Sequence, residues 1–107
     1  MTSYRMNDRP ELPADWATDP YWSAAVHILD SFGDDGRVWA HVSTEGIDYP
    51  AILDEGWSGG QRRILRAAAS LWNDETPVSV LDILAGVGDA HWQRFIEAAQ
   101  ILRDGLR

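Results

Sequence analysis

The segment Trp-Ser-Gly-Gly-Gln-Arg-Arg at residues 57–63 constrains the fold more than any other, because it indicates where a long helix begins. Ser58 and Gln61 have the spacing of a capping box, in which each side chain bonds the backbone N–H of the other residue. Apolar residues then recur at helical spacing and form one stripe: Ile64, Leu65, Ala68, Leu71 and Trp72. We therefore expect a helix over residues 58–73.

Similar signals predict the other helices. Asp19 suits an N-cap and Pro20 the first helical position, and Gly33 is placed to end that helix in a left-handed conformation. Thr76 and Asp89 are expected to cap two later helices. The predicted elements are helices over residues 20–32, 58–73, 77–86 and 89–104, and a short helical turn over residues 49–55 that Gly56 closes.

A small β element is expected between the first two long helices. Residues 37–43 alternate as in a half-buried strand, with Val38, Ala40 and Val42 on one side and Arg37, Trp39 and His41 on the other. The nearest partner strand lies around Ile47, after a turn. The fold class is therefore mainly α, or α+β with a minor two-stranded β element, with about four helices packed around a Trp-rich core.

A chain of 107 residues, of which 45% are hydrophobic, is long enough for one domain with a single core. We expect an irregular N-terminal arm at residues 1–18, where Pro10 and Pro13 lie among polar residues, and a single globular helical domain at residues 19–107. The six tryptophans are spread along the chain, and we expect most of them in the core. One or two exposed tryptophans would instead mark a binding surface.

The net charge of −8 is concentrated in the first half, since residues 1–55 hold 11 of the 17 acidic residues but three of the nine arginines. This acidic half repels nucleic acid and anionic membranes and suits a basic protein partner. The chain has no cysteine, which excludes disulfides, thiolate metal sites and a cysteine nucleophile. The first residues contain neither a signal peptide nor a membrane span, so we expect a cytoplasmic protein.

The start of the helix at residues 58–73 is also a candidate anion-binding site. Two glycines in the first turn leave backbone N–H groups accessible at the positive end of the helix dipole, and arginines follow within one turn. The candidate residues are Ser58, Gly59, Gly60, Arg62, Arg63 and Arg66. In the alternative interpretation, the glycines let another segment pack closely and the arginines pair with Asp54 and Glu55.

Residues 58–61, Ser-Gly-Gly-Gln, resemble the signature loop of ABC-transporter ATPases, in which these residues open a helix and help to hold the nucleotide γ-phosphate. The rest of the chain departs from that family, because it has no phosphate loop of the form Gly-x-x-x-x-Gly-Lys-Ser/Thr and no lysine. We interpret the match as a local coincidence of helix capping. Residues 57–61 and 70–72 also resemble small proteins of high-GC bacteria with a Trp-Ser-Ser/Gly-Gly-Glu/Gln helix start, a resemblance that implies no function.

Other chemistries find little support. The two helices expected over residues 77–86 and 89–104 resemble a helix-turn-helix, but the second one mixes acids with arginines and lacks the basic surface that phosphate contacts require. His27, His41 and His91 lie far apart without paired ligand spacing, so we predict no metal site and no cofactor. No nucleophile motif such as Gly-x-Ser-x-Gly is present, and we expect no enzyme.

Our preferred function is a non-catalytic protein-interaction or accessory module that binds another protein, with self-association left open. Its candidate interface consists of Trp39 and His41 in the predicted strand and of the acidic turn at Asp34 and Asp35. The rival function is a small anion- or nucleic-acid-binding regulator that uses the candidate anion-binding site.

Overall fold

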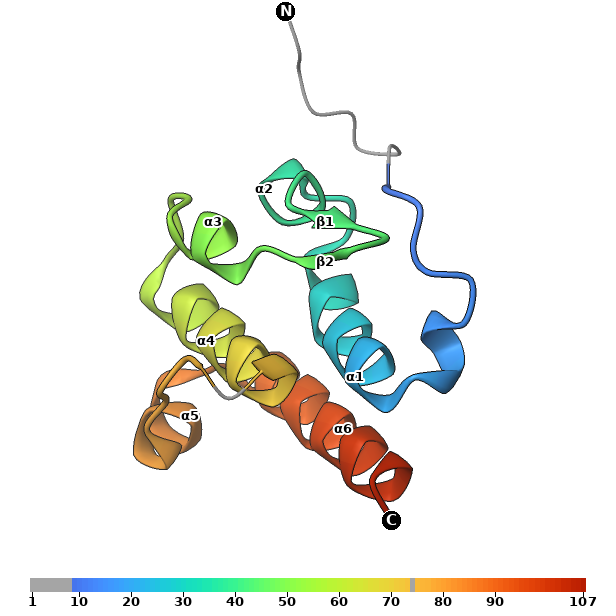
Figure 1. The fold of residues 1–107 in the computed structure, drawn as a ribbon. Helices are drawn as coiled ribbons and strands as arrows, with labels where there is room; N and C mark the ends of the chain where they lie inside the picture. Colours follow the sequence, from blue (N-terminus) through green and yellow to red (C-terminus); the bar gives the residue numbers. More distant parts are fainter. Residues whose placement is uncertain (1–8, 74) are drawn as a thin grey trace, which may run out of the picture.

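The computed structural model describes residues 9–73 and 75–107 and shows a mainly helical fold with one small antiparallel sheet (Figure 1). Its α-helices in these residues are α1 (Pro20–Leu29), α2 (Gly36–Trp39), α3 (Tyr49–Leu53), α4 (Gly59–Asn73), α5 (Val80–Gly86) and α6 (Asp89–Gly105). The 3₁₀-helices η1 (Trp16–Thr18) and η2 (Asp30–Phe32) flank α1, and the strands are β1 (Val42–Ser43) and β2 (Gly46–Ile47). The predicted fold class is confirmed.

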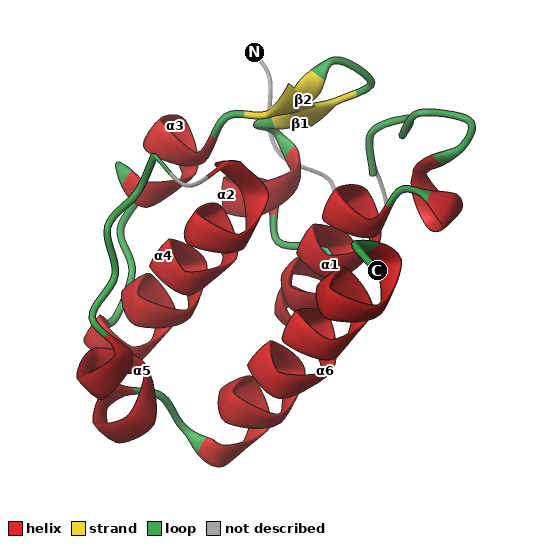
Figure 2. Ribbon diagram, turned by 60° about the horizontal axis from the view of Figure 1, so that its bottom comes forward, coloured by secondary structure: helices red, strands yellow, loops and turns green. Residues whose placement is uncertain are grey.

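α1, α4 and α6 form a bundle in which α1 packs against both of the other two (Figures 1 and 2). α2, the two strands and α3 add further buried residues to the core. Small residues let these helices approach closely, and the buried ones are Ala24, Ala25, Ala67, Ala68, Ala69 and Ala98. α2, the hairpin and α3 lie at the end of the bundle where α1 ends and α4 begins, while α5 lies outside, against α4 (Figure 1). None of the helices in residues 9–73 and 75–107 combines the length and apolar composition that crossing a membrane requires.

The predicted start of α1 is confirmed. The Asp19 carboxylate accepts hydrogen bonds from the backbone N–H groups of Tyr21, at 2.9 Å, and of Trp22, at 3.3 Å. Pro20 occupies the first helical position, where no N–H is needed. α1 continues into η2, after which Gly33 has a φ of +63°, a conformation that favours glycine.

The strand predicted over residues 37–43 is wrong in its first half, where the chain forms α2. Asp35 caps this helix, because its carboxylate accepts from the N–H of Arg37 at 2.9 Å. Val38 and Trp39 are both buried, with 0% and 3% exposure. Neighbouring residues of a half-buried strand point to opposite faces, so burial of both requires a different backbone.

The partner strand predicted around Ile47 is confirmed, since β2 pairs antiparallel with β1 in the register Val42↔Ile47 and Ser43↔Gly46. The helical turn expected over residues 49–55 is α3, whose N-cap Asp48 accepts from the N–H of Ala51 at 3.1 Å. Residues 9–15 of the predicted irregular arm contain no helix or strand. Residues 1–8 of that arm lie outside the described residues.

Two predicted caps are wrong. α5 begins at Val80, and its cap is Ser79, whose Oγ accepts from the N–H of Asp82 at 3.4 Å, and not Thr76. α6 begins at Asp89, but Asp89 is the first helical residue and not the cap. Its carboxylate still lies at the positive end of the helix dipole, where a negative charge is favourable.

Two of the six tryptophans lie in the core and the other four pack against it, so the prediction that most belong to the core is confirmed only in part. Trp22 and Trp39 are buried, and the others are partly buried against the core: Trp16, Trp57, Trp72 and Trp92. The rings of Trp22 and Trp72 meet edge to face with centroids 4.9 Å apart, a geometry that aromatic pairs prefer.

Tyr49, at the start of α3, should limit the stability of the fold. Its side chain is buried, and its hydroxyl has no hydrogen-bond partner among the described residues. Burial also raises the pKa of the phenol, because the charged form would lose its hydration. An unpaired buried polar group costs about 1–3 kcal/mol, so we expect Tyr49→Phe to raise the free energy of unfolding by about 1 kcal/mol in urea denaturation.

The matched control is Tyr21→Phe, which removes the same hydroxyl from a side chain that is 41% exposed. This variant should stay within about 0.5 kcal/mol of the wild type. A Tyr49→Phe protein that is less stable than the wild type would contradict the prediction.

Candidate functional site

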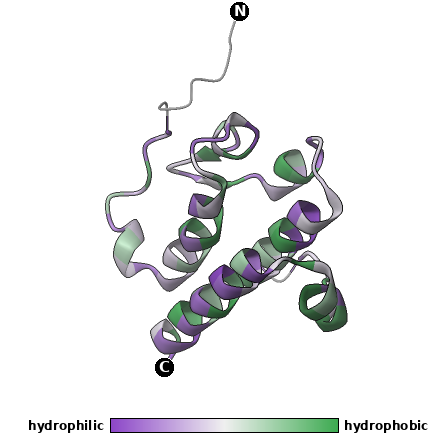
Figure 3. Ribbon diagram, turned by 180° about the vertical axis from the view of Figure 1, so that it is seen from behind, coloured by the Kyte–Doolittle hydropathy of each residue, from purple (hydrophilic) through white to green (hydrophobic). Residues whose placement is uncertain are grey.

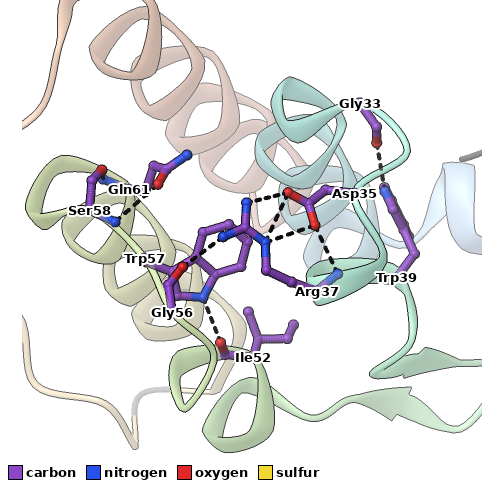
Figure 4. Close-up of polar contacts among 9 residues, drawn as sticks. All are labelled: Gly33, Asp35, Arg37, Trp39, Ile52, Gly56, Trp57, Ser58 and Gln61. Atoms are coloured by element: carbon purple, nitrogen blue, oxygen red, sulfur yellow. Dashed lines mark hydrogen bonds and ion pairs between the residues drawn. The ribbon is translucent and has the colours of Figure 1, made fainter. Parts of the chain in front are cut away.

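The capping box predicted at the start of α4 is present. The N–H of Ser58 donates to Oε1 of Gln61 at 3.0 Å, and the N–H of Gln61 donates to Oγ of Ser58 at 3.3 Å. The indole N–H of the preceding Trp57 donates to the carbonyl oxygen of Ile52 at 2.7 Å (Figure 4). The start of α4 is therefore bonded both to itself and to α3.

The glycine pair in the first turn of α4 is not required by packing. A Cβ atom on Gly59 would lie 3.5 Å from Nη1 of Arg63, and one on Gly60 would lie 3.6 Å from the carbonyl oxygen of Gly86. Both are ordinary van der Waals distances, and neither glycine has a positive φ. These distances contradict the interpretation that the glycines are there to let another segment approach.

Arg62 has a structural role. It donates from Nη1 to the carbonyl oxygen of Leu53 at 2.6 Å and from Nη2 to that of Glu55 at 3.4 Å. Carbonyl groups at the end of a helix lack partners within the helix, and Arg62 supplies donors at the end of α3. The expected pairing of this arginine with the carboxylates of Asp54 and Glu55 is therefore wrong, because it binds backbone oxygens instead.

Arg63 and Arg66 are bound less tightly. Arg63 donates from Nη1 to the carbonyl oxygen of Gly86 at 3.4 Å, which is a long hydrogen bond. Arg66 is exposed and makes no hydrogen bond within the described part of the chain. Neither side chain forms an ion pair with a carboxylate of residues 9–73 or 75–107.

The three arginines line one cleft between α4 and the segment that leads into α5, with a volume of about 560 Å³. Its walls carry three guanidinium groups and one carboxylate, and consist of Gly59, Arg62, Arg63, Arg66, Pro77, Val78, Ser79 and Asp82. Ser58 and Gly60 of the candidate anion-binding site do not line it. We call this feature the arginine cleft; sequence reasoning identified one of its walls and missed the wall at residues 77–82.

Trp39 and His41 of the candidate interface are engaged within the protein. The indole N–H of Trp39 donates to the carbonyl oxygen of Gly33 at 2.7 Å (Figure 4). The guanidinium of Arg9 lies 4.2 Å from the ring centroid of Trp39. Nε2 of His41 lies 2.8 Å from Oε2 of Glu55. The assignment of Trp39 to an interface is therefore wrong, because α2 turns this side chain into the core.

Asp34 and Asp35 use their carboxylates in a similar way. Nε of Arg9 donates to Oδ1 of Asp34 at 2.7 Å. Nη2 of Arg37 donates to Oδ2 of Asp35, also at 2.7 Å (Figure 4). The hydrogen bond from Arg37 holds the pKa of Asp35 below its usual value. The two acids are thus paired with arginines of their own half of the chain and do not form an open acidic surface.

α5 exposes apolar side chains that sequence reasoning did not identify as a surface. Val80, Leu81 and Leu84 are 69%, 69% and 59% exposed, whereas Ile83 is buried. We call these three exposed residues the α5 face; Figure 3 shows α5 as an apolar helix on the outside of the bundle. No sequence signal separates them from Ile83, because all four belong to one wide apolar stripe.

The histidines lie at three separate places. His27 pairs with Glu97 at 2.7 Å, and His41 pairs with Glu55. The ring of His91 stacks on Phe32 with centroids 5.5 Å apart, and burial lowers its pKa. Within residues 9–73 and 75–107, no group of three or more His, Asp or Glu side chains could hold a metal ion.

Comparisons with protein-family models, with curated proteins and with solved structures find no match for this chain. The residues and surfaces described above are therefore the basis for inferring its function.

The bonding of the arginines predicts a difference between two alanine variants. Arg62→Ala leaves the carbonyl groups of Leu53 and Glu55 without their charged donor and should lower the free energy of unfolding by about 1.5–3 kcal/mol. Arg66→Ala removes the same charge from a side chain that makes no hydrogen bond in the described residues, and it should change the free energy of unfolding by about 0.5 kcal/mol or less. Urea denaturation of both proteins measures this, and equal losses of stability would show that Arg62 has no special structural role.

Proposed function

We propose that this protein is a non-catalytic interaction module that binds another protein through the α5 face. The observation that carries the proposal is the exposure of Val80, Leu81 and Leu84 on a helix that contributes a single buried residue, Ile83, to the core. The helix thus presents more apolar surface to solvent than it buries in the fold.

Val80, Leu81 and Leu84 lie close together on one short helix. Burying one leucine or valine side chain fully contributes about 1.5–3 kcal/mol of favourable free energy. Three such side chains exposed on one short helix could therefore contribute substantially to binding a partner. A single exposed leucine is ordinary, whereas contiguous exposed apolar residues on a soluble protein mark interaction sites. Binding of a partner would remove this surface from water.

The composition of the arginine cleft supports a non-catalytic role. Nucleophilic catalysis needs a nucleophile within hydrogen-bond reach of a base. Ser79 is the only hydroxyl residue that lines the cleft in the described residues, and its Oγ caps α5. Among the same residues, the one carboxylate that lines the cleft, that of Asp82, is exposed.

The net charge of −8 supports a partner that is basic overall, because long-range attraction would speed its approach. At contact the local groups decide instead, since salt screens exposed charges beyond about 8–10 Å. The nature of the contacting segment therefore depends on what surrounds the α5 face.

A second candidate function is that of a small anion-binding regulator. The observation that favours it is the arginine cleft, where Arg63 and Arg66 have no carboxylate partner among the described residues. Titration with inorganic phosphate and with a nucleotide, followed by NMR chemical shifts of the cleft residues, tests this function. Saturable shifts that Arg66→Ala abolishes would support it.

The interaction function predicts that Leu81→Asp reduces the recovery of a bound partner from an extract of the native host by about tenfold or more, because a carboxylate would be buried in an apolar contact. Quantitative mass spectrometry of the captured proteins measures this. The matched control is Leu106→Asp, a leucine that is 58% exposed at the end of α6. Equal recovery with Leu81→Asp and with the wild type would contradict the proposal.

A further inference from the structure

The arginine cleft and the α5 face adjoin each other on one helix. Ser79 and Asp82 line the cleft, and Leu81 of the α5 face is the residue next to Asp82. Consecutive residues of an α-helix are separated by about 100° around its axis. Leu81 therefore lies about 100° from Asp82 around α5, and Leu84 about 60° beyond Leu81. A ligand segment that contacts both the cleft and the α5 face must pass around the exposed side of this helix, and it meets Leu81 first.

The cations of the cleft differ from those of the N-terminal half. Arg9 pairs with Asp34, and Arg37 pairs with Asp35, so their charges are balanced within the protein. The cleft instead holds three arginines against one carboxylate, that of Asp82. Its local charge is positive although the whole chain carries −8.

The side chain of Arg63 passes directly over Gly86, since a Cβ atom on that glycine would lie 2.3 Å from Cδ of Arg63. The side chain is exposed, and its hydrogen bond to the carbonyl oxygen of Gly86 is long. A guanidinium presents two parallel donors, a geometry that matches a carboxylate. Arg63 can therefore exchange this weak bond for a carboxylate of a ligand.

We propose that the arginine cleft and the α5 face together bind an acidic amphipathic segment of a partner protein. Carboxylates of that segment pair with Arg63 and Arg66, and its apolar side chains cover Leu81 and Leu84. This inference rests on the proposed interaction function and adds the chemistry of the segment that docks. It uses both surfaces at once, as helices that insert into grooves do.

Other anionic ligands fit less well. Nucleic acid and anionic membranes carry dense arrays of negative charge, and a chain of −8 repels them more strongly than it repels a segment with a few carboxylates. A free phosphate would satisfy the arginines but would leave Val80, Leu81 and Leu84 in water. Charge and apolar surface together therefore favour the acidic amphipathic segment.

Selection from a random dodecapeptide library displayed on phage, with the wild-type protein as bait, tests this inference. Enriched peptides should combine Asp or Glu with large apolar residues. The affinity of a synthesised peptide, measured by fluorescence anisotropy, should fall about tenfold or more in Arg66→Glu and in Leu81→Asp. The matched control is Arg103→Glu, which makes the same charge change at an exposed position on α6 and should leave affinity unchanged.

Two further variants separate binding from folding. Asp82→Asn removes the carboxylate of the cleft and should strengthen peptide binding about threefold, a gain that partial unfolding cannot produce. Gly86→Ala keeps every charge but displaces Arg63, so it should weaken binding. Circular dichroism at the assay temperature verifies that each variant is folded.

The outcomes distinguish this inference from the interaction function itself. If the selected peptides lack acidic residues but still require Leu81 for binding, the inference of an acidic segment is wrong, whereas the proposed interaction function through the α5 face is supported. A selection that yields no Leu81-dependent peptide would count against both. Binding of inorganic phosphate alone, of a DNA duplex or of phosphatidylserine vesicles that depends on Arg66, with no peptide binding, would overturn the inference in favour of that ligand.

Discussion

The burial of α1 between α4 and α6 is the interaction on which the rest of this fold depends. Six of the ten residues of α1 are buried, and alanines on all three helices allow the close contact. At the end of α6 a Cβ atom on Gly105 would lie 2.3 Å from Cβ of Pro20, which shows how near the two backbones come. α5 packs against α4 and adds only Ile83 to the core, so its other large apolar side chains remain exposed.

The parts of the fold that could be predicted from the sequence depend on residues close together along the chain. The cap at Asp19 and the capping box of Ser58 and Gln61 are of this kind, because a side chain there satisfies a backbone group two or three residues away. α2 was missed because residues 37–43 alternate as in a half-buried strand, whereas the structure buries both Val38 and Trp39. Their burial is decided by contacts with the core, which local pattern does not contain.

The candidate site also contains one part that could be predicted from the sequence and one part that could not. Gly59 and the arginines could be placed together because they share the first turns of one helix, whereas the opposite wall at residues 77–82 depends on how α5 packs on α4. The pairing of the acidic turn also depends on residues far apart in the sequence. The partner of Asp34 is Arg9, 25 residues away, and no local pattern shows which acid an arginine will neutralise.

α5 is attached to the rest of the fold by few contacts. A helix of seven residues is too short to be stable alone in water, and this one is held by Ile83 and by the long hydrogen bond from Arg63 to Gly86. Segments with few buried contacts open locally, without unfolding of the whole domain. We therefore expect the amide hydrogens of α5 to exchange with solvent faster than those of α4. A ligand that covers α5 would have to bind tightly enough to suppress this local opening.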